Sequence, residues 1–332
     1  MVKLTSMNVS QSINMSVCPK LIQLPLSKLE PQLVTPLVCI FLTLTVSATL
    51  LNSMTFILYF KKSQLRKKRS VKLLLSLAAS DLMVGVLVSP ISIAQTLKQL
   101  SSPCHYINRI ARGCQIIMIL TVVIMCTITL EQYLNIVRHN IYHKVLPSCR
   151  FKLFLSAPWI FSISLLVFGS FSNLAGLWTV VFTWFIMFVT IFVIYWKIHI
   201  HLQNRQKSWN SQEHSNVLIT IHKQNKKSTK MMLRIVTGVI ICSITGYCSM
   251  VVILLDHYQV AGLPWLKTWR KYPVAIIANI LQQSNSIVNP VLYYCRSTDF
   301  SKALKELVTE LKNSTACYPF RKTPRSDQDT PS

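Results

Sequence analysis

Apolar residues gather into seven runs that are each long enough to cross a bilayer, and polar or basic segments separate them. We predict transmembrane helices at about 35–60, 71–96, 108–137, 151–172, 177–198, 230–255 and 273–295. Between the fourth and fifth runs lies only the short segment SNLAG, residues 172–176. The pattern therefore predicts an all-α membrane protein built as a bundle of seven transmembrane helices.

The cations between these runs predict how the chain is oriented. The segment KKSQLRKKRS (61–70), the link 138–152 and the long segment before the sixth run are rich in Lys and Arg, and the alternate links hold far fewer. Cytoplasmic loops carry the excess of positive charge. We therefore expect a multi-pass protein with its N-terminus outside the cell and its C-terminus in the cytoplasm.

The segments outside the bundle follow from that orientation. The outer segment, residues 1–34, carries glycosylation sequons at Asn8 and Asn14. After the bundle, residues 35–295, the segment 298–313 repeats apolar residues at intervals of three and four, which predicts a short amphipathic eighth helix on the inner leaflet. Cys317 follows it, either palmitoylated or as a plain thiol. The region 296–332 is thus a cytoplasmic helix and a disordered tail.

Composition supports the bilayer as the solvent. Hydrophobic residues make up 51% of the chain and charged residues 14%, against about a quarter charged in soluble domains. The formal net charge is +25, but the cations are confined to the gaps between apolar runs, so we expect membrane lipids rather than nucleic acid as partners. The ten cysteines form no C-x-x-C pair, which argues against a zinc or redox site.

Short motifs fall at fixed places within these runs. They include Asn52, SLAASDLMVGVLVSP around Asp81, Glu131-Gln132-Tyr133, Trp159, Tyr195 and NSIVNPVLYY (285–294). Over about residues 35–312 the chain resembles the rhodopsin-like G-protein-coupled receptors, with some melanocortin-like and amine-receptor-like features. The resemblance implies a plasma-membrane receptor that passes an extracellular signal to heterotrimeric G proteins.

Asp81 is the only acid in the middle of a run, and a carboxylate there requires partners. Oxygen-bearing side chains occur at a similar depth: Asn52, Thr121, Asn285, Ser286 and Asn289. In the family this cluster holds a sodium ion, so the resemblance implies an allosteric sodium site at Asp81 and no other cofactor. A hydrogen-bonded polar core without an ion is the alternative.

Other positions resemble the activation switch of the family. Pro290 frees a carbonyl of its helix, and we expect a polar neighbour such as Asn289 to satisfy it. The resemblance implies that Tyr195 and Tyr293 swing inward on activation, and the alternative is that both are interfacial aromatics. Tyr133 completes the signature at the end of the third run.

Three positions depart from the family pattern. Gln132 stands where the family has an arginine, and its neutral amide cannot form a charge-assisted pair, so we expect Glu131 to lack its usual neighbour and the resting lock to be weaker. Ser243 and Thr245 stand for the tryptophan and proline of the sixth helix. Without that proline the helix need not kink.

The outer half of the bundle suggests a ligand class. No acid lies between residues 104 and 130, which argues against an amine, whereas Arg109 and Arg112 suit the head group of an anionic or lipid-like ligand. Contact of these cations with lipid phosphates is the alternative. By helix position the other pocket-facing residues are Cys114, Gln115, Met118, Gly246, Tyr247, Gln282 and Gln283.

The resemblance also implies a disulfide from the top of the third helix, but the second outer loop has no cysteine. A pair between Cys18 and Cys104 is the open candidate in an oxidising exterior. Neither a nucleophile–base–acid set nor a metal-ligand cluster lies at one depth, so we expect no enzymatic activity. We therefore expect an orphan signalling receptor, with a non-signalling decoy, scaffold or partner subunit as the alternative.

Overall fold

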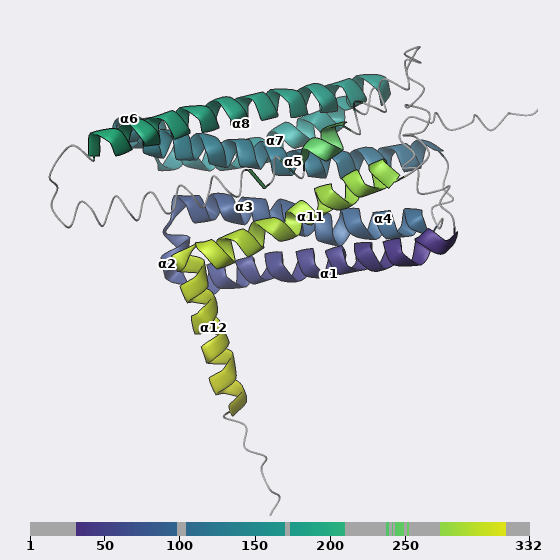
Figure 1. Ribbon diagram of the computed structural model, residues 1–332, viewed down its shortest axis with the longest axis horizontal. Helices are drawn as coiled ribbons and strands as arrows, with labels where there is room; N and C mark the ends of the chain where they lie inside the picture. Colours follow the sequence, from purple (N-terminus) through teal and green to yellow (C-terminus); the bar gives the residue numbers. More distant parts are fainter. Residues whose placement is uncertain are drawn as a thin grey trace, which may run out of the picture.

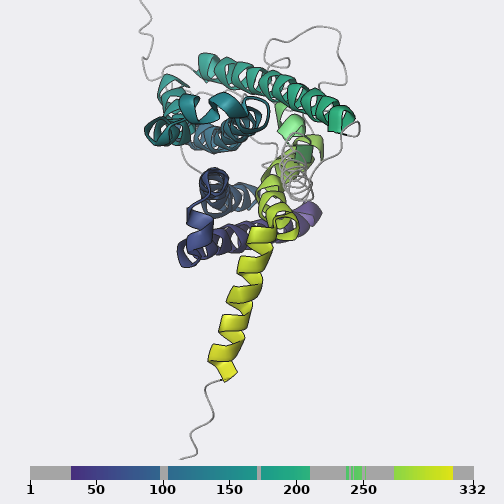
Figure 2. The ribbon, with the colours of Figure 1, turned by 90° about the vertical axis from the view of Figure 1, so that its left-hand side faces the viewer.

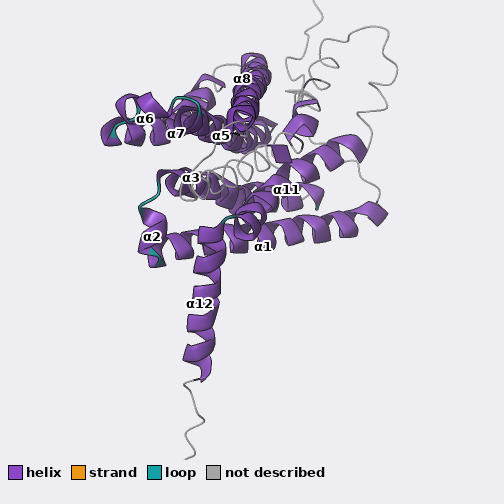
Figure 3. Cartoon of the chain, turned by 60° about the vertical axis from the view of Figure 1, so that its left-hand side comes forward, coloured by secondary structure: helices purple, strands orange, loops and turns teal. Residues whose placement is uncertain are grey.

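The computed structural model describes residues 31–97, 104–169, 173–209, 237–238, 241, 243–248, 251 and 273–316. Helices account for nearly all of these residues, and no strand occurs among them (Figure 3). The helical class predicted from the apolar runs is therefore confirmed for this part of the chain.

The long helices coincide with the predicted runs. They are α1 (Pro31–Lys61), α3 (Arg69–Met83) continued by η2 (Val84–Val88) and α4 (Ser89–Thr96), α5 (Cys104–Ile136), α7 (Ser148–Gly169), α8 (Asn173–Trp209) and α11 (Pro273–Arg296). Helix α8 continues well beyond residue 198, where its run was predicted to end. Two short helices in the links, α2 (Ser63–Arg66) and α6 (His139–Val145), were not predicted.

Five helical segments of the described part are long and apolar enough to span a membrane. They are Gln32–Lys61, Arg69–Thr96, Arg112–Ile136, Ser148–Phe168 and Trp178–Asn204. The seventh predicted span forms helix α11, but it is not among the five, which fits the polar residues concentrated in its middle, from Gln282 to Asn289. Most of the sixth predicted span lies outside the described residues.

The second span changes its helical winding just before Pro90. Proline has no N–H and its ring clashes with the carbonyl four residues earlier, so the preceding turn must widen. The wide turn η2 lies here, and Gly85 within it approaches α1 closely. A Cβ atom on Gly85 would lie 2.8 Å from Oγ1 of Thr49 and 3.1 Å from its backbone nitrogen.

The spans lie side by side along one direction (Figure 1). Helix α5 packs against α3, α7 and α8, while α1 packs against α3, α4 and α11. The main hydrophobic core forms among α1, α3, α5 and α11, and includes Leu77, Ile124, Met125 and Tyr293. This arrangement brings the polar residues of the first, second and seventh runs together inside the bundle.

Helix α12 (Thr298–Ala316) leaves the end of α11 and runs crosswise to the bundle, away from it (Figures 1 and 2). Its start packs against the core through the buried Phe300, Ala303 and Leu307. The helix predicted over 298–313 is therefore present.

Candidate functional site

The fully buried Asp81 on α3 is bound by two side chains of α11. Ser286 Oγ donates a 2.9 Å hydrogen bond to Oδ1 of Asp81, and Asn289 Nδ2 donates one of 2.9 Å to Oδ2. Both donors are themselves buried. One carboxylate thus joins the second and seventh predicted spans, as the shared depth of these residues suggested.

Asn52 on α1 extends this polar cluster to a third helix. Its Nδ2 atom donates to the carbonyl of Ser286 at 2.9 Å and to that of Ala48 at 2.9 Å. Because Pro290 lacks an N–H, the carbonyl of Ser286 has lost its ordinary helical donor. A polar neighbour does satisfy this carbonyl, as expected, but it is Asn52 and not the suggested Asn289, whose amide is committed to Asp81.

Several buried oxygens of the cluster have no hydrogen-bond partner in the described part of the chain. They are Oδ1 of Asn52, Asn285 and Asn289. Buried polar atoms are normally paired with protein, water or an ion. Carboxylate and amide oxygens are the ligands that hard cations prefer, so the donor set fits a small cation beside Asp81. Thr121 is also buried, and its hydroxyl donates to Oγ of Ser80, the neighbour of Asp81, at 3.4 Å.

Tyr293 lies one helical turn after Asn289 on α11 and is fully buried. Its hydroxyl pairs with Thr55 Oγ1 at 3.2 Å, and its ring centroid lies 5.1 Å from that of Phe300 on α12. Tyr293 thereby connects α1, α11 and α12. Tyr195 on α8 is half-buried and has no hydrogen bond among the described residues.

Glu131 at the inner end of α5 has two hydrogen-bond donors although no arginine follows it. Gln132 Nε2 donates to Oε2 of Glu131 at 2.9 Å, and the hydroxyl of Tyr142 donates to Oε1 at 2.8 Å. Glu131 is 2% exposed and Gln132 8%. Glu131 thus lacks the arginine of the family pattern, and Gln132 and the next link provide neutral donors in its place. The weaker resting lock stays a prediction.

Tyr142 and Arg69 belong to this site, and the sequence interpretation did not include them. The guanidinium carbon of Arg69 lies 5.6 Å from the ring centroid of Tyr142 and 5.3 Å from that of Phe151, and its Nη1 donates to the carbonyl of Leu146 at 2.7 Å. Burial, followed by the charge of Glu131, raises the pKa of Tyr142 to about 12, which keeps its hydroxyl a donor near neutral pH. We name Glu131, Gln132, Tyr142 and Arg69 the inner cluster.

The half of the bundle that holds the N-terminal part of α5 contains an aromatic group between α8 and the helical residues 243–248. Trp184 stacks on Tyr247 with ring centroids 6.4 Å apart, and Phe188 lies edge-on to both. Met118 and Cys114, two of the predicted pocket residues, pack against the same group. The Trp184 indole nitrogen is buried without a hydrogen-bond partner among the described residues.

Two glutamines predicted to face this pocket have different surroundings. Gln282 lies directly over Gly246, where an added Cβ would come within 2.5 Å of Oε1 of Gln282. Gln283 lies on the face of α11 that α4 covers, and it is fully buried there rather than exposed to a pocket. It accepts a 2.7 Å hydrogen bond from Ser89 and donates to Ser92 at 3.0 Å and to Asn279 at 2.7 Å.

The remaining predicted positions are placed as follows. Arg109 is exposed and Arg112 half-buried near the outer end of α5, and Gln115 is half-buried one turn further. Ser243 is buried, while Thr245 and Tyr133 are half-buried. Asn8, Asn14, Cys18 and Cys317 lie outside the described residues, as does the side chain of Cys104, so the disulfide stays a prediction.

Comparison with known proteins adds no relative. No protein-family model matches the chain, and a search of curated proteins finds no match either. The argument for function therefore rests on the residues and their contacts.

Proposed function

We propose that this protein is an atypical rhodopsin-like G-protein-coupled receptor. It would transmit an extracellular signal through a seven-helix bundle to heterotrimeric G proteins at the plasma membrane. The observation that carries the proposal is the buried Asp81 carboxylate, which Ser286 and Asn289 bind from another helix. An ionisable group deep in a membrane bundle is expensive and is typically retained for a function.

The contacts around Asp81 suggest how a signal would cross the membrane. Asn52 binds the Ser286 carbonyl, and Thr55 binds the hydroxyl of Tyr293, so α1, α3 and α11 share one hydrogen-bonded path. A displacement of α11 by a ligand would have to break or rearrange that path. A sodium ion among the free oxygens of Asn52, Asn285 and Asn289 would stabilise the arrangement. In this proposal the ion is an allosteric ligand.

The inner cluster would form the resting lock at the G-protein side. Gln132 and Tyr142 both donate to Glu131, and a buried carboxylate with two donors resists separation. Movement of the link that carries Tyr142 would open this lock. The basic segments beside it, 61–70 and 138–152, suit an acidic cytoplasmic partner surface.

The extracellular ligand would be anionic or lipid-like. Arg109 and Arg112 lie near the outer end of α5, and the apolar group of Met118, Trp184 and Tyr247 lies further along the bundle. A carboxylate or phosphate head near the arginines and an apolar body against the aromatic side chains would match both. The N-terminal segment would then lie outside the cell.

Basal G-protein activation in cells tests the proposal. The native chain is compared with Gln132→Arg at matched surface expression, across a panel of G proteins. The matched control is Gln203→Arg, which adds the same charge at an exposed position of α8. We expect the native chain to activate at least one G protein and Gln132→Arg to change that level, with Gln203→Arg close to the native chain.

The alternative is a receptor-fold protein that does not signal, acting as a decoy, scaffold or partner subunit. The Gln132 amide is buried against Glu131, and Ser243 is buried in place of the bulky residue that the family has there. If the native chain and Gln132→Arg are both silent while well expressed, this alternative is favoured.

A further inference from the structure

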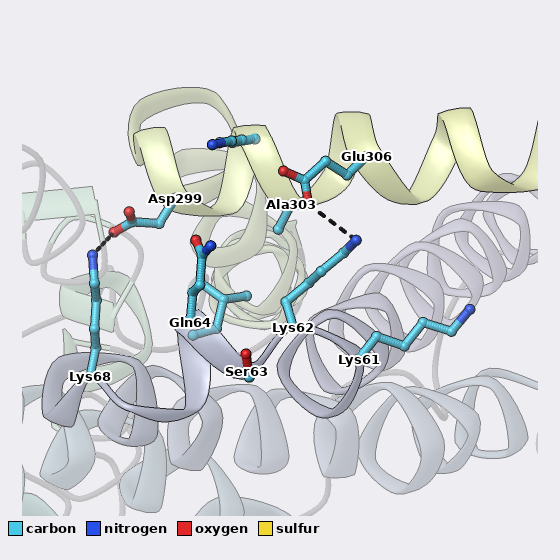
Figure 4. A pocket seen from close by; sticks show the side chains of 10 residues that line it. Lys61, Lys62, Ser63, Gln64, Lys68, Asp299, Ala303 and Glu306 are labelled. Atoms are coloured by element: carbon cyan, nitrogen blue, oxygen red, sulfur yellow. Dashed lines mark hydrogen bonds and ion pairs between the residues drawn. The ribbon is translucent and has the colours of Figure 1, made fainter.

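A cavity of about 190 Å³ lies between the turn after α1 and the start of α12 (Figure 4). Its lining residues are Lys61, Lys62, Ser63, Gln64, Leu65, Lys68, Asp299, Lys302, Ala303 and Glu306. The first apolar span ends at Lys61 and the second begins at Arg69, so the cavity lies where both spans end. That depth corresponds to the headgroup layer of a bilayer.

Two of the lining lysines reach across the cavity to carboxylates of α12 (Figure 4). Lys68 Nζ lies 2.6 Å from Asp299 Oδ2, and Lys62 Nζ lies 3.1 Å from Glu306 Oε2 and 2.7 Å from Glu310 Oε1. A lysine ammonium has three N–H donors. Lys68 therefore keeps two donors and Lys62 one, while the ion pairs hold both ammonium groups in place.

The side chains of the other two lining lysines, Lys61 and Lys302, are exposed, and neither ammonium group forms a hydrogen bond or ion pair with the described residues. The charge of Lys61 acts on Glu310 only from a distance. Four lysines against the two lining carboxylates leave the cavity with a net charge of +2. Arg66 and Lys67 on the same turn add positive charge nearby, and Glu310, which pairs with Lys62, adds one negative charge. The cavity is thus suited to a ligand with several negative charges.

We propose that this cavity binds the headgroup of a phospholipid that carries a polyphosphorylated inositol. Clusters of Lys and Arg directly after a transmembrane helix attract the anionic lipids of the cytoplasmic leaflet. Phosphate oxygens would take the free donors of Lys61, Lys302 and Lys68. Ile57 and Phe60, which precede Lys61 on α1, are 44% and 61% exposed and would contact the acyl chains of the same lipid.

A lipid source is favoured over a soluble inositol phosphate because this apolar surface lies next to the charged cavity. A phosphatidylserine headgroup has one phosphate and one carboxylate, and its ammonium group cancels one of these two negative charges, so it is a weaker match for the lysines. The proposal goes beyond G-protein coupling and rests only on the inward orientation of residues 61–70.

The test measures binding of fluorescent phosphatidylinositol bisphosphate to the purified full chain in phosphatidylcholine nanodiscs. The cavity variant is Lys61→Gln/Lys302→Gln. The matched control is Lys67→Gln/Lys305→Gln, which removes two exposed cations from the same two segments outside the cavity lining. We expect the cavity variant to weaken binding by about tenfold or more and the control by less than about threefold.

A charge-conserving variant, Lys61→Arg/Lys302→Arg, separates loss of charge from loss of fold, and we expect it to bind like the native chain. Unlabelled phosphatidylserine at equal total charge should compete poorly. Equal losses in the cavity and control variants, or equal competition by phosphatidylserine, would overturn the proposal. If soluble inositol trisphosphate binds as tightly as the lipid, the lipid assignment is overturned.

This binding assay contains no G protein. A chain that binds the lipid but activates no G protein would therefore contradict the proposed function alone, and the reverse result would contradict the lipid site alone.

Discussion

The hydroxyl of Tyr142 donates a 2.8 Å hydrogen bond to Oε1 of the buried Glu131, eleven residues before it in the chain. The other oxygen of that carboxylate accepts from Gln132 at 2.9 Å. In the receptors that the sequence resembles, an arginine occupies the position of Gln132. Here two neutral donors bind the acid, and the cation Arg69 lies over the ring of Tyr142. In the proposed receptor, these contacts would take the place of the arginine-based lock.

Removing the Tyr142 hydroxyl should therefore destabilise the protein. In Tyr142→Phe the buried Glu131 loses one of its two donors, which costs about 1–3 kcal/mol of folding free energy. The thermal midpoint of the purified chain measures this loss. Tyr133→Phe is the matched control, since Tyr133 is half-buried and its hydroxyl has no hydrogen bond among the described residues. Equal midpoints for the two variants would argue against the lock.

The close approach of α1 to the wide turn η2 predicts that alanine destabilises the protein at one glycine, Gly85, but not at another, Gly113. In Gly85→Ala the new Cβ meets the backbone nitrogen of Thr49 at 3.1 Å, so the helices must separate, at a cost of about 1–3 kcal/mol. Gly113 on α5 has no heavy atom within 4 Å of the corresponding position. Gly113→Ala should be neutral or stabilising by up to about 1 kcal/mol. Thermal unfolding in nanodiscs compares the two, and similar destabilisation in both would refute the close contact.

The free oxygens near Asp81 predict a specific response to sodium. The thermal midpoint of the native chain should rise in sodium chloride relative to choline chloride at equal ionic strength, because the ion binds the folded state. Asp81→Asn should abolish that difference. Asp299→Asn, which removes an acid from α12, should keep it. A native chain that responds equally to both salts would support a polar core without an ion.

The attachment of α12 should depend on pH only at the extremes. The hydrogen bond from Lys62 lowers the pKa of Glu310 from its ordinary 4.5, and the bonds to Glu310 and Glu306 raise the pKa of Lys62 from 10.5. Glu310 therefore contributes fully above pH 4.5 and loses its contribution as the pH falls through the lowered pKa. Lys62 contributes fully below pH 10.5 and loses its contribution as the pH rises through the raised pKa.

Spin labels at Gln64 and Thr309, with the native exposed cysteines replaced, measure this attachment. The distance between them should stay constant across the middle range and broaden in strong acid or strong base. Lys62→Gln should broaden it at every pH. A distance that does not respond to Lys62→Gln would show that burial of Phe300, Ala303 and Leu307 alone holds α12.

The parts of the fold that were predicted correctly are those that produce a residue pattern within a single segment of the sequence. Apolar runs identified the helices, and the intervals of three and four over 298–313 identified α12. The shared depth of Asp81, Ser286 and Asn289 predicted their association because helix position fixes depth. The polar character of α11 was also visible in the sequence, and it keeps this helix from being among the five most apolar spans of the described residues.

The contacts that were missed depend on how separate elements pack. Arg69 was counted only as one more cation of a basic link, and no periodicity relates it to Tyr142. Gln283 was assigned to a pocket because helix position gives a face but not the neighbour that covers it, which is α4. The pairing of Asn52 with the carbonyl freed by Pro290 likewise required the register of α1 against α11.

The central proposal is tested most directly by nucleotide exchange on purified G-protein heterotrimers. The protein is reconstituted in phosphatidylcholine–phosphatidylserine nanodiscs for this measurement. Three chains are compared at equal concentration: the native protein, Tyr142→Phe and the double variant Gln132→Arg/Tyr142→Phe. The account predicts that the native chain accelerates exchange over empty nanodiscs for at least one heterotrimer, and that releasing Glu131 from Tyr142 increases the rate. If all three chains, folded and monodisperse, leave exchange at the rate of empty nanodiscs, the protein does not couple to G proteins and the non-signalling alternative holds.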